Sequence, residues 1–103
     1  MEHRAWICNA WSSDLSGLQC VTQRREPLKA GEVRVRVRAA ALNFPDLLMT
    51  QGKYQHKPAL PFVAGMECAG EVLEVAPDVS TLQPGDRVCY GSHGGAFAEE
   101  LVA

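Results

Sequence analysis

The sequence has 103 residues, of which 47% are hydrophobic and 21% charged, and its formal net charge is −2. This length predicts one domain with a modest core. The near-neutral charge argues against nucleic-acid binding, which normally requires a basic excess. No apolar stretch is long enough to cross a bilayer, and the first residues lack the pattern of a signal peptide. We therefore expect a cytoplasmic protein with no membrane or nucleic-acid partner.

The first third of the chain predicts two strands and a turn. Residues Arg4 to Trp11 and Leu18 to Arg24 are the two expected strands, and Pro27 ends the second. Trp6 and Trp11 are expected to be strand and core aromatics. The four cysteines, at positions 8, 20, 68 and 89, lack the close paired spacing of disulfide frameworks and zinc knuckles. We expect reduced thiols, buried as small apolar side chains.

Apolar and polar residues alternate from Glu32 to Ala39. Successive side chains of a strand point to opposite faces, so this alternation predicts a strand with one buried face. The valines are assigned to the core. The three arginines are assigned to solvent: Arg34, Arg36 and Arg38.

A short helix of about two turns is expected after this strand. Pro45 suits the first helical turn, and Asp46 beside it favours the positive end of the helix dipole. Gly52 is a natural stop at the C-terminal end. Residues 53–61 hold two prolines and little periodicity, so they are expected to form a loop.

The second half of the chain predicts further short strands. Phe62 to Ala76 has a strand pattern in which Gly65 and Gly70 mark a bend, a bulge or a close backbone approach. Strong turn signals at 77–78 and 84–86 separate it from two short strands, Arg87 to Tyr90 and Ala96 to Val102. Many short strands and one short helix predict a mainly β fold, a partly closed barrel.

Four segments resemble, in order and spacing, the medium-chain dehydrogenase/reductase superfamily: Ala39 to Asp46, Gly52 to Tyr54, Gly65 to Val72, and Pro84 to Val88. The resemblance implies a GroES-like β-barrel catalytic domain, followed in that superfamily by a Rossmann domain and a segment that completes the first. Residues 1–103 would be an incomplete catalytic domain. No two glycines are separated by one residue, so the G-x-G-x-x-G turn that admits a pyrophosphate is absent. We expect the isolated fragment to be inactive.

Asn43 and Met66 stand where zinc-dependent alcohol dehydrogenases of this superfamily have a cysteine and a histidine. Amide and thioether groups bind Zn²⁺ poorly compared with thiolate and imidazole. The four-cysteine structural zinc lobe is also missing after Val88. The resemblance therefore implies the zinc-free, quinone oxidoreductase-type branch, with NADPH as the cofactor, bound mainly by a domain outside this chain. Without a Lewis acid, acceptors already activated by conjugation are favoured, such as quinones and enones.

Within that branch, the resemblance places Asn43 and Tyr54 close to the nicotinamide, as catalytic and cofactor-binding residues. An amide can donate and accept hydrogen bonds, and a phenol can donate to a developing oxyanion or supply a proton. The alternatives are a helix N-cap for Asn43 and an aromatic that packs a loop for Tyr54. Leu48 stands where some quinone oxidoreductases have a further tyrosine, so no role is carried over to it.

Other ionisable residues are weaker candidates. Asp46 is expected to be structural, in the first turn of the helix. Glu67 is expected to be a buried carboxylate whose partner lies beyond residue 103. His3, His56 and His93 share no spacing typical of ligands or a catalytic triad, and His56 is expected at the surface beside the substrate loop.

The sequence thus predicts the catalytic-domain portion of an NADPH-dependent quinone oxidoreductase-type enzyme, whose full-length form is expected to be a homodimer. An enoyl thioester reductase, including the polyketide-synthase type, is the alternative enzyme. A stand-alone, non-catalytic GroES-like module is the alternative from another class.

Overall fold

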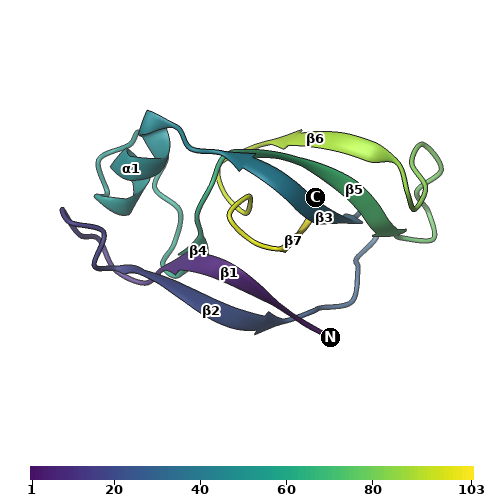
Figure 1. Ribbon diagram of the computed structural model, residues 1–103, viewed down its shortest axis with the longest axis horizontal. Coiled ribbons are helices and arrows are strands. Elements are labelled where there is room, and N and C mark those ends of the chain that lie inside the picture. The colour runs from purple at the N-terminus through teal and green to yellow at the C-terminus, as the bar shows by residue number, and fades with distance from the viewer.

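The computed structural model describes residues 1–103. Its elements are β1 (Glu2–Cys8), β2 (Leu18–Arg24), β3 (Val33–Ala41), α1 (Phe44–Thr50), β4 (Phe62–Val63), β5 (Glu67–Val75), β6 (Arg87–Gly91) and β7 (Glu100–Val102). The strands form two antiparallel sheets, one in the order β2-β1-β4 and one in the order β6-β5-β3-β7. α1 lies at one end of the long axis and the connection between β5 and β6 at the other (Figure 1). The chain forms no helix with the length and apolar character that crossing a membrane requires.

The two sheets are joined along β1. Ala5 forms an isolated bridge with Ala98, in the segment that leads into β7. The Trp6 N–H donates to the Phe97 carbonyl at 2.8 Å, and the Trp6 carbonyl accepts from the Ala64 N–H at 3.0 Å. Because the contacts with Phe97 and Ala98 link β1 to the segment that leads into β7 of the other sheet, the fold is a partly closed barrel. The expected mainly β fold with one short helix is confirmed.

The core lies against the face of β3 that carries its first valines. Val33 and Val35 are buried and pack with Val72 of β5 and Leu101 of β7. A fully buried side chain of this size stabilises the fold by about 1.5–3 kcal/mol relative to an exposed one. The alternation in β3 therefore identified its core-facing valines correctly.

Arg34 lies between these valines and is only 2% exposed. Its Nε donates to Glu74 Oε1 on β5 at 2.6 Å, and its Nη2 donates to the Glu26 carbonyl. The connection that follows β2 thus covers the face that alternation assigns to solvent. The prediction of a solvent-facing arginine is wrong for Arg34 and confirmed for Arg36 and Arg38, which are exposed.

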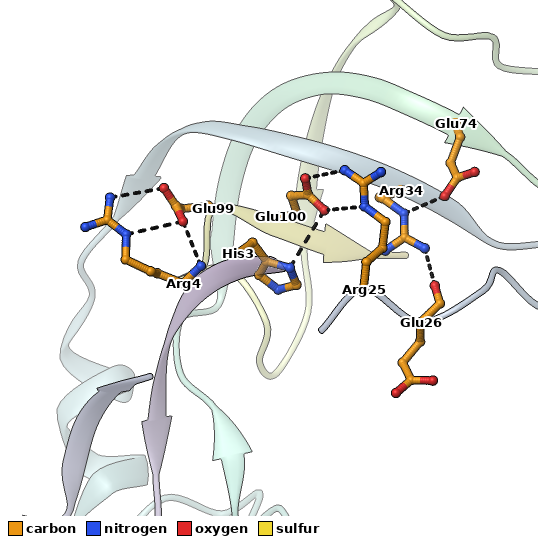
Figure 2. A network of polar contacts seen from close by, with 8 residues as sticks. All are labelled: His3, Arg4, Arg25, Glu26, Arg34, Glu74, Glu99 and Glu100. Carbon is orange, nitrogen blue, oxygen red and sulfur yellow. Dashed lines mark hydrogen bonds and ion pairs between the residues drawn. The ribbon is translucent and has the colours of Figure 1, made fainter. Parts of the chain in front are cut away.

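A network of charged side chains joins the sheets at the end of the barrel opposite α1 (Figure 2). Glu100 of β7 accepts hydrogen bonds of 3.0 and 2.6 Å from Arg25, which follows β2. Its carboxylate also lies 3.7 Å from Nδ1 of His3 on β1. We refer to these three residues together with the Arg34–Glu74 pair as the ionic end.

The long strand expected over Phe62 to Ala76 is divided between the sheets. β4 pairs with β1, whereas β5 pairs with β3. Gly65 lies between them with φ +97°, and a Cβ there would lie 2.5 Å from Phe97 Cδ1. Glycine is needed because other residues avoid this φ and the ring leaves no room. The strand expected over Ala96 to Val102 is also shorter, since regular pairing begins at Glu100.

The tryptophans lie at the surface rather than in the core. Trp6, on β1, is 47% exposed and Trp11 is 40% exposed. Trp11 lies beyond the end of β1 at Cys8, and its ring packs on Gly52 and 6.1 Å from the Phe62 ring. The prediction of core aromatics is therefore wrong for both.

All four cysteines are free thiols. Cys8 and Cys68 are buried, and burial raises the pKa of both thiols. Cys20 and Cys89 are exposed. The expectation of buried thiols is thus confirmed for two of them and wrong for the other two.

Candidate functional site

Three neighbouring strands end or begin at the α1 end of the four-stranded sheet (Figure 1). Glu67, the first residue of β5, pairs with Ala41 at the end of β3 and with Gly91 at the end of β6. Since neighbouring antiparallel strands bring opposite chain ends together, the residues after β3 and β6 flank the start of β5. Segments from three parts of the sequence meet there.

A groove of about 480 Å³ opens at this meeting point. Only one of its lining side chains is hydrophobic, and we call it the polar groove. Its size is in the range of small-molecule binding sites. The lining residues are Asn43, Pro45, Met66, Glu67, Gly91, Ser92 and His93.

Asn43 occupies the N-cap position of α1 with an extended backbone. Its Nδ2 donates across the groove to Glu67 Oε1 at 3.2 Å. Asn43 and Asp46 form a capping box at the helix start, in which Asp46 Oδ2 accepts from the Asn43 backbone N–H at 2.8 Å and the Asn43 side chain faces the Asp46 N–H without a hydrogen bond to it. Asn43 Oδ1 therefore makes no hydrogen bond within the chain.

The carboxylates of Asp46 and Glu67, which both lie in segments that resemble the superfamily, occupy different environments. Asp46 is buried in the first turn of α1, so the structural role expected for it is confirmed. Glu67 is exposed, and its partner is Asn43 within this chain. Glu67 is thus not buried within residues 1–103, and the partner expected for it beyond residue 103 stays a prediction.

Two histidines meet beside the groove. The rings of His56 and His93 have centroids 4.3 Å apart and are tilted by 32°. His93 lines the groove, and His56, in the loop that follows α1, contacts the His93 ring. Their sequence spacing gave no sign of this contact, because it depends on how two loops fold back. Ser92 and His93 are thus site residues that the sequence reasoning missed.

Tyr54 lies in the loop after α1 and is half-buried. It is not among the residues that line the polar groove. The structure thus brings Asn43 to Glu67 and His93 but leaves Tyr54 outside this group. Its role at the nicotinamide stays a prediction.

The family can be assigned once this geometry is known. Residues 29–103 match the model of the alcohol dehydrogenase GroES-like domain. The chain belongs to this domain family. The GroES-like domain is the catalytic-domain fold of the medium-chain dehydrogenases/reductases, so the superfamily and its quinone oxidoreductase-type branch are confirmed.

Named relatives of this GroES-like domain include oxidoreductases. It is 44% identical over 100 residues to quinone oxidoreductase-like protein 2 of Mus musculus, covering 97% of this chain and 28% of that protein. It is 51% identical over 77 residues to an erythronolide synthase of Saccharopolyspora erythraea, covering 75% of this chain and 2% of that protein. A mycobacterial protein solved in complex with NADPH has a TM-score of 0.81 and 31% identity, over 98% of this chain and 31% of that one. The chain thus spans less than a third of each relative.

Proposed function

We propose that this GroES-like domain is the first part of the catalytic domain of an NADPH-dependent, zinc-free oxidoreductase that reduces quinones or other conjugated carbonyls. The observation that supports this most directly is the Asn43 amide, which Glu67 holds at the polar groove and whose Oδ1 makes no hydrogen bond within the chain. Because the chain spans less than a third of its relatives, we assign most of the NADPH contacts to a Rossmann domain outside residues 1–103. We further propose that the full-length protein is a cytoplasmic homodimer.

The hydrogen-bonding groups of the polar groove fit a nicotinamide. A carboxamide needs an acceptor for its NH₂ group and a donor for its oxygen. Asn43 Oδ1 offers the acceptor, and Ser92 and His93 offer donors. Glu67 engages Asn43 Nδ2, which orients the amide with Oδ1 directed away from the carboxylate. When bound, a reduced nicotinamide supplies a hydride.

The same groove fits zinc poorly. Glu67 and His93 are the only lining side chains of a type that Zn²⁺ prefers, and no third such residue joins them, whereas a catalytic zinc takes three protein ligands. Met66 and Asn43 add only a thioether and an amide. We therefore assign polarisation of the acceptor carbonyl to hydrogen-bond donors of the groove. Quinones and conjugated carbonyls suit such a site because conjugation already stabilises the charge that hydride addition creates.

A proton donor is needed for the oxyanion that hydride addition leaves on the acceptor. Tyr54 is one candidate, from the family resemblance. His93 is the second, because it lines the polar groove and imidazole is the side chain most often used as a general acid. His56 packs on the His93 ring and limits its movement.

An Asn43→Ala exchange in the full-length protein tests this proposal. The variant should reduce 1,4-benzoquinone with NADPH at a kcat/KM about 10- to 100-fold below that of the wild type, since a positioning contact is lost. Asn9→Ala is a matched control, because the Asn9 side chain bonds only to Gln19 on the β1–β2 hairpin. Equal kcat/KM values for the two variants would refute a nicotinamide site at the polar groove.

The similarity to an erythronolide synthase favours an enoyl thioester as the second candidate acceptor. The two candidate acceptors can be distinguished by assaying the same enzyme with crotonyl thioester and with benzoquinone. Faster reduction of the thioester would identify an enoyl thioester reductase. Absence of both activities, together with absence of NADPH binding in calorimetry, would identify a binding module instead.

A further inference from the structure

The connection from α1 to β4 has little backbone support. We call its residues 53–61 the α1–β4 loop, which carries Tyr54 and His56. The Lys53 N–H donates to the Leu48 carbonyl at 2.9 Å, but residues 54–61 take part in no backbone hydrogen bond. Hydrogen bonds of the kind that fix helices and strands therefore do not hold this loop. Its position depends on side-chain packing.

One surface side chain, the Trp11 indole, contacts the start, the middle and the end of this loop. At the start, a Cβ on Gly52 would lie 3.1 Å from Trp11 Cδ2, so the indole lies against the glycine. In the middle, Lys57 Nζ lies 5.8 Å from the centroid of the indole ring, within the range of a cation–π interaction. At the end, the Phe62 ring packs at a centroid distance of 6.1 Å and a tilt of 42°. A single side chain thus holds the loop at three points.

Trp11 is itself held by the backbone beside it. The N–H of the next residue, Ser12, donates to the Thr50 carbonyl at the end of α1 at 3.0 Å. Ser12 Oγ accepts from the Gly17 N–H at 3.1 Å, just before β2. The Trp11 side chain is nevertheless 40% exposed, so core packing does not explain a large aromatic residue here. Its place on a bonded segment, against a loop without backbone bonds, indicates a restraint on that loop.

We propose that Trp11 is a positioning residue, whose indole fixes the α1–β4 loop so that His56 stays against His93 at the polar groove. The His56 and His93 rings have centroids 4.3 Å apart, and His93 lines the groove. His56 is the neighbour in sequence of Lys57, the loop residue over the indole. The catalytic consequence rests on the proposed function, in which Tyr54 or His93 donates the proton, whereas the restraint on the loop does not.

Trypsin measures the restraint on the loop in the full-length protein. The protease cleaves after Lys53 but not after Lys57, because Pro58 follows the second lysine. Cleavage of a native loop requires that the loop opens, so the rate reports the population of the open form. In Trp11→Ala, the rate of cleavage after Lys53 should rise about 10-fold, because all three ring contacts are lost. Mass spectrometry of the fragment that begins at Tyr54 gives this rate.

Three further variants separate the indole from a general loss of stability. Trp11→Phe keeps a ring against Gly52 and should restore most of the wild-type resistance. Lys57→Gln removes the charge from an exposed side chain and should raise the cleavage rate about 2- to 5-fold without a change in the urea midpoint. Trp6→Ala is the matched control, because Trp6 is 47% exposed and lines a hollow that contains no loop residue. Unchanged cleavage after Lys53 in both Trp11→Ala and Lys57→Gln, or an equal rise in Trp6→Ala, would overturn the proposal.

Turnover shows whether the fixed loop serves catalysis. With NADPH and 1,4-benzoquinone, the kcat of Trp11→Ala should fall about 10-fold and that of Trp11→Phe should recover, since a displaced loop misplaces its side chains. The KM for NADPH should stay within about twofold of the wild-type value, because we assign most cofactor contacts to another domain. A wild-type kcat in Trp11→Ala, despite faster cleavage after Lys53, would overturn the positioning role. A wild-type protein inactive with benzoquinone and with crotonyl thioester would refute the proposed function, and the cleavage rates would then decide whether Trp11 holds the loop.

Discussion

The ionic end of the barrel pairs its arginines with carboxylates (Figure 2), whereas the groove end leaves acceptors unpaired. Arg34 and Arg25 are bound to Glu74 and Glu100, and His3 Nδ1, 3.7 Å from Glu100, is the buried polar atom of this end that has no hydrogen bond. At the other end, Asn43 and Asp46 each keep one oxygen without a partner in the chain. Polar groups that satisfy one another stabilise the fold, and polar groups left open can serve a ligand. The two ends should therefore respond differently to substitution.

The largest effect on stability is expected at Arg34. Its side chain is 2% exposed, and its guanidinium bonds to Glu74 and to the Glu26 carbonyl. Arg34→Ala should lower the free energy of unfolding by about 2–4 kcal/mol, the sum of lost charged hydrogen bonds and lost packing. Urea denaturation followed by circular dichroism measures this change.

Arg36→Ala is the matched control on the same strand. Arg36 is exposed, so its replacement should change the free energy of unfolding by no more than about 0.5 kcal/mol. If both arginines gave the same small change, the ionic end would contribute no stability.

The next largest effect on stability is expected at Glu100, and its size should depend on pH. Hydrogen bonds from Arg25 hold the pKa of the Glu100 carboxyl below its ordinary value, and the charges of Arg25, His3 and Arg34 act in the same direction, against the opposing effect of burial. A lowered pKa in the folded state means that the ionised carboxylate stabilises the fold above the ordinary value of 4.5. This stabilisation is lost as the pH falls through the lowered value.

Glu100→Gln should accordingly be less stable than the wild type at neutral pH, and the difference should shrink as the pH falls below the ordinary carboxyl range. Urea midpoints measured across the acid range for both proteins check this. A difference between wild type and Glu100→Gln that stays constant with pH would show that the ionisation of Glu100 does not contribute.

At the groove end, Asn43→Ala should change stability little. A side chain that caps a helix through a hydrogen bond typically contributes about 1 kcal/mol, but the Asn43 amide lies in the capping box of α1 without such a bond and donates to Glu67. In urea denaturation, the free energy of unfolding should decrease by clearly less than that value, and the helix content should not change. A decrease of about 1 kcal/mol in the free energy of unfolding would show that the Asn43 amide caps α1 and does not bind a ligand.

Local chemistry explains why much of the fold could be predicted. Gly52 and Gly85 have φ of +70° and +94°, as expected for a helix stop and a turn. The alternation along β3 predicted that its valines lie in the core, and Val33 and Val35 do. Asp46 was placed correctly in the first turn of α1. Each of these features depends on neighbours in the sequence.

Features that depend on distant segments could not be predicted. Arg34 is buried because the connection that contains Glu26 covers it. His56 meets His93 because two loops fold toward each other, and no spacing rule describes that contact. Asn43 was identified through the family resemblance, but its bond to Glu67 required the pairing of β3 with β5.

The smallest effect is expected at Glu99, next to Glu100 in the chain. Hydrogen bonds from Arg4 lower the pKa of its carboxyl too, but the two side chains are 50% and 69% exposed. Water and salt weaken such a pair, so Glu99→Gln should hardly move the urea midpoint, and any change should disappear in about 1 M salt. Glu100, with a side chain 11% exposed, should keep its contribution in the same salt. Equal and salt-independent losses for the two glutamates would mean that burial does not decide which charge pairs hold the barrel together.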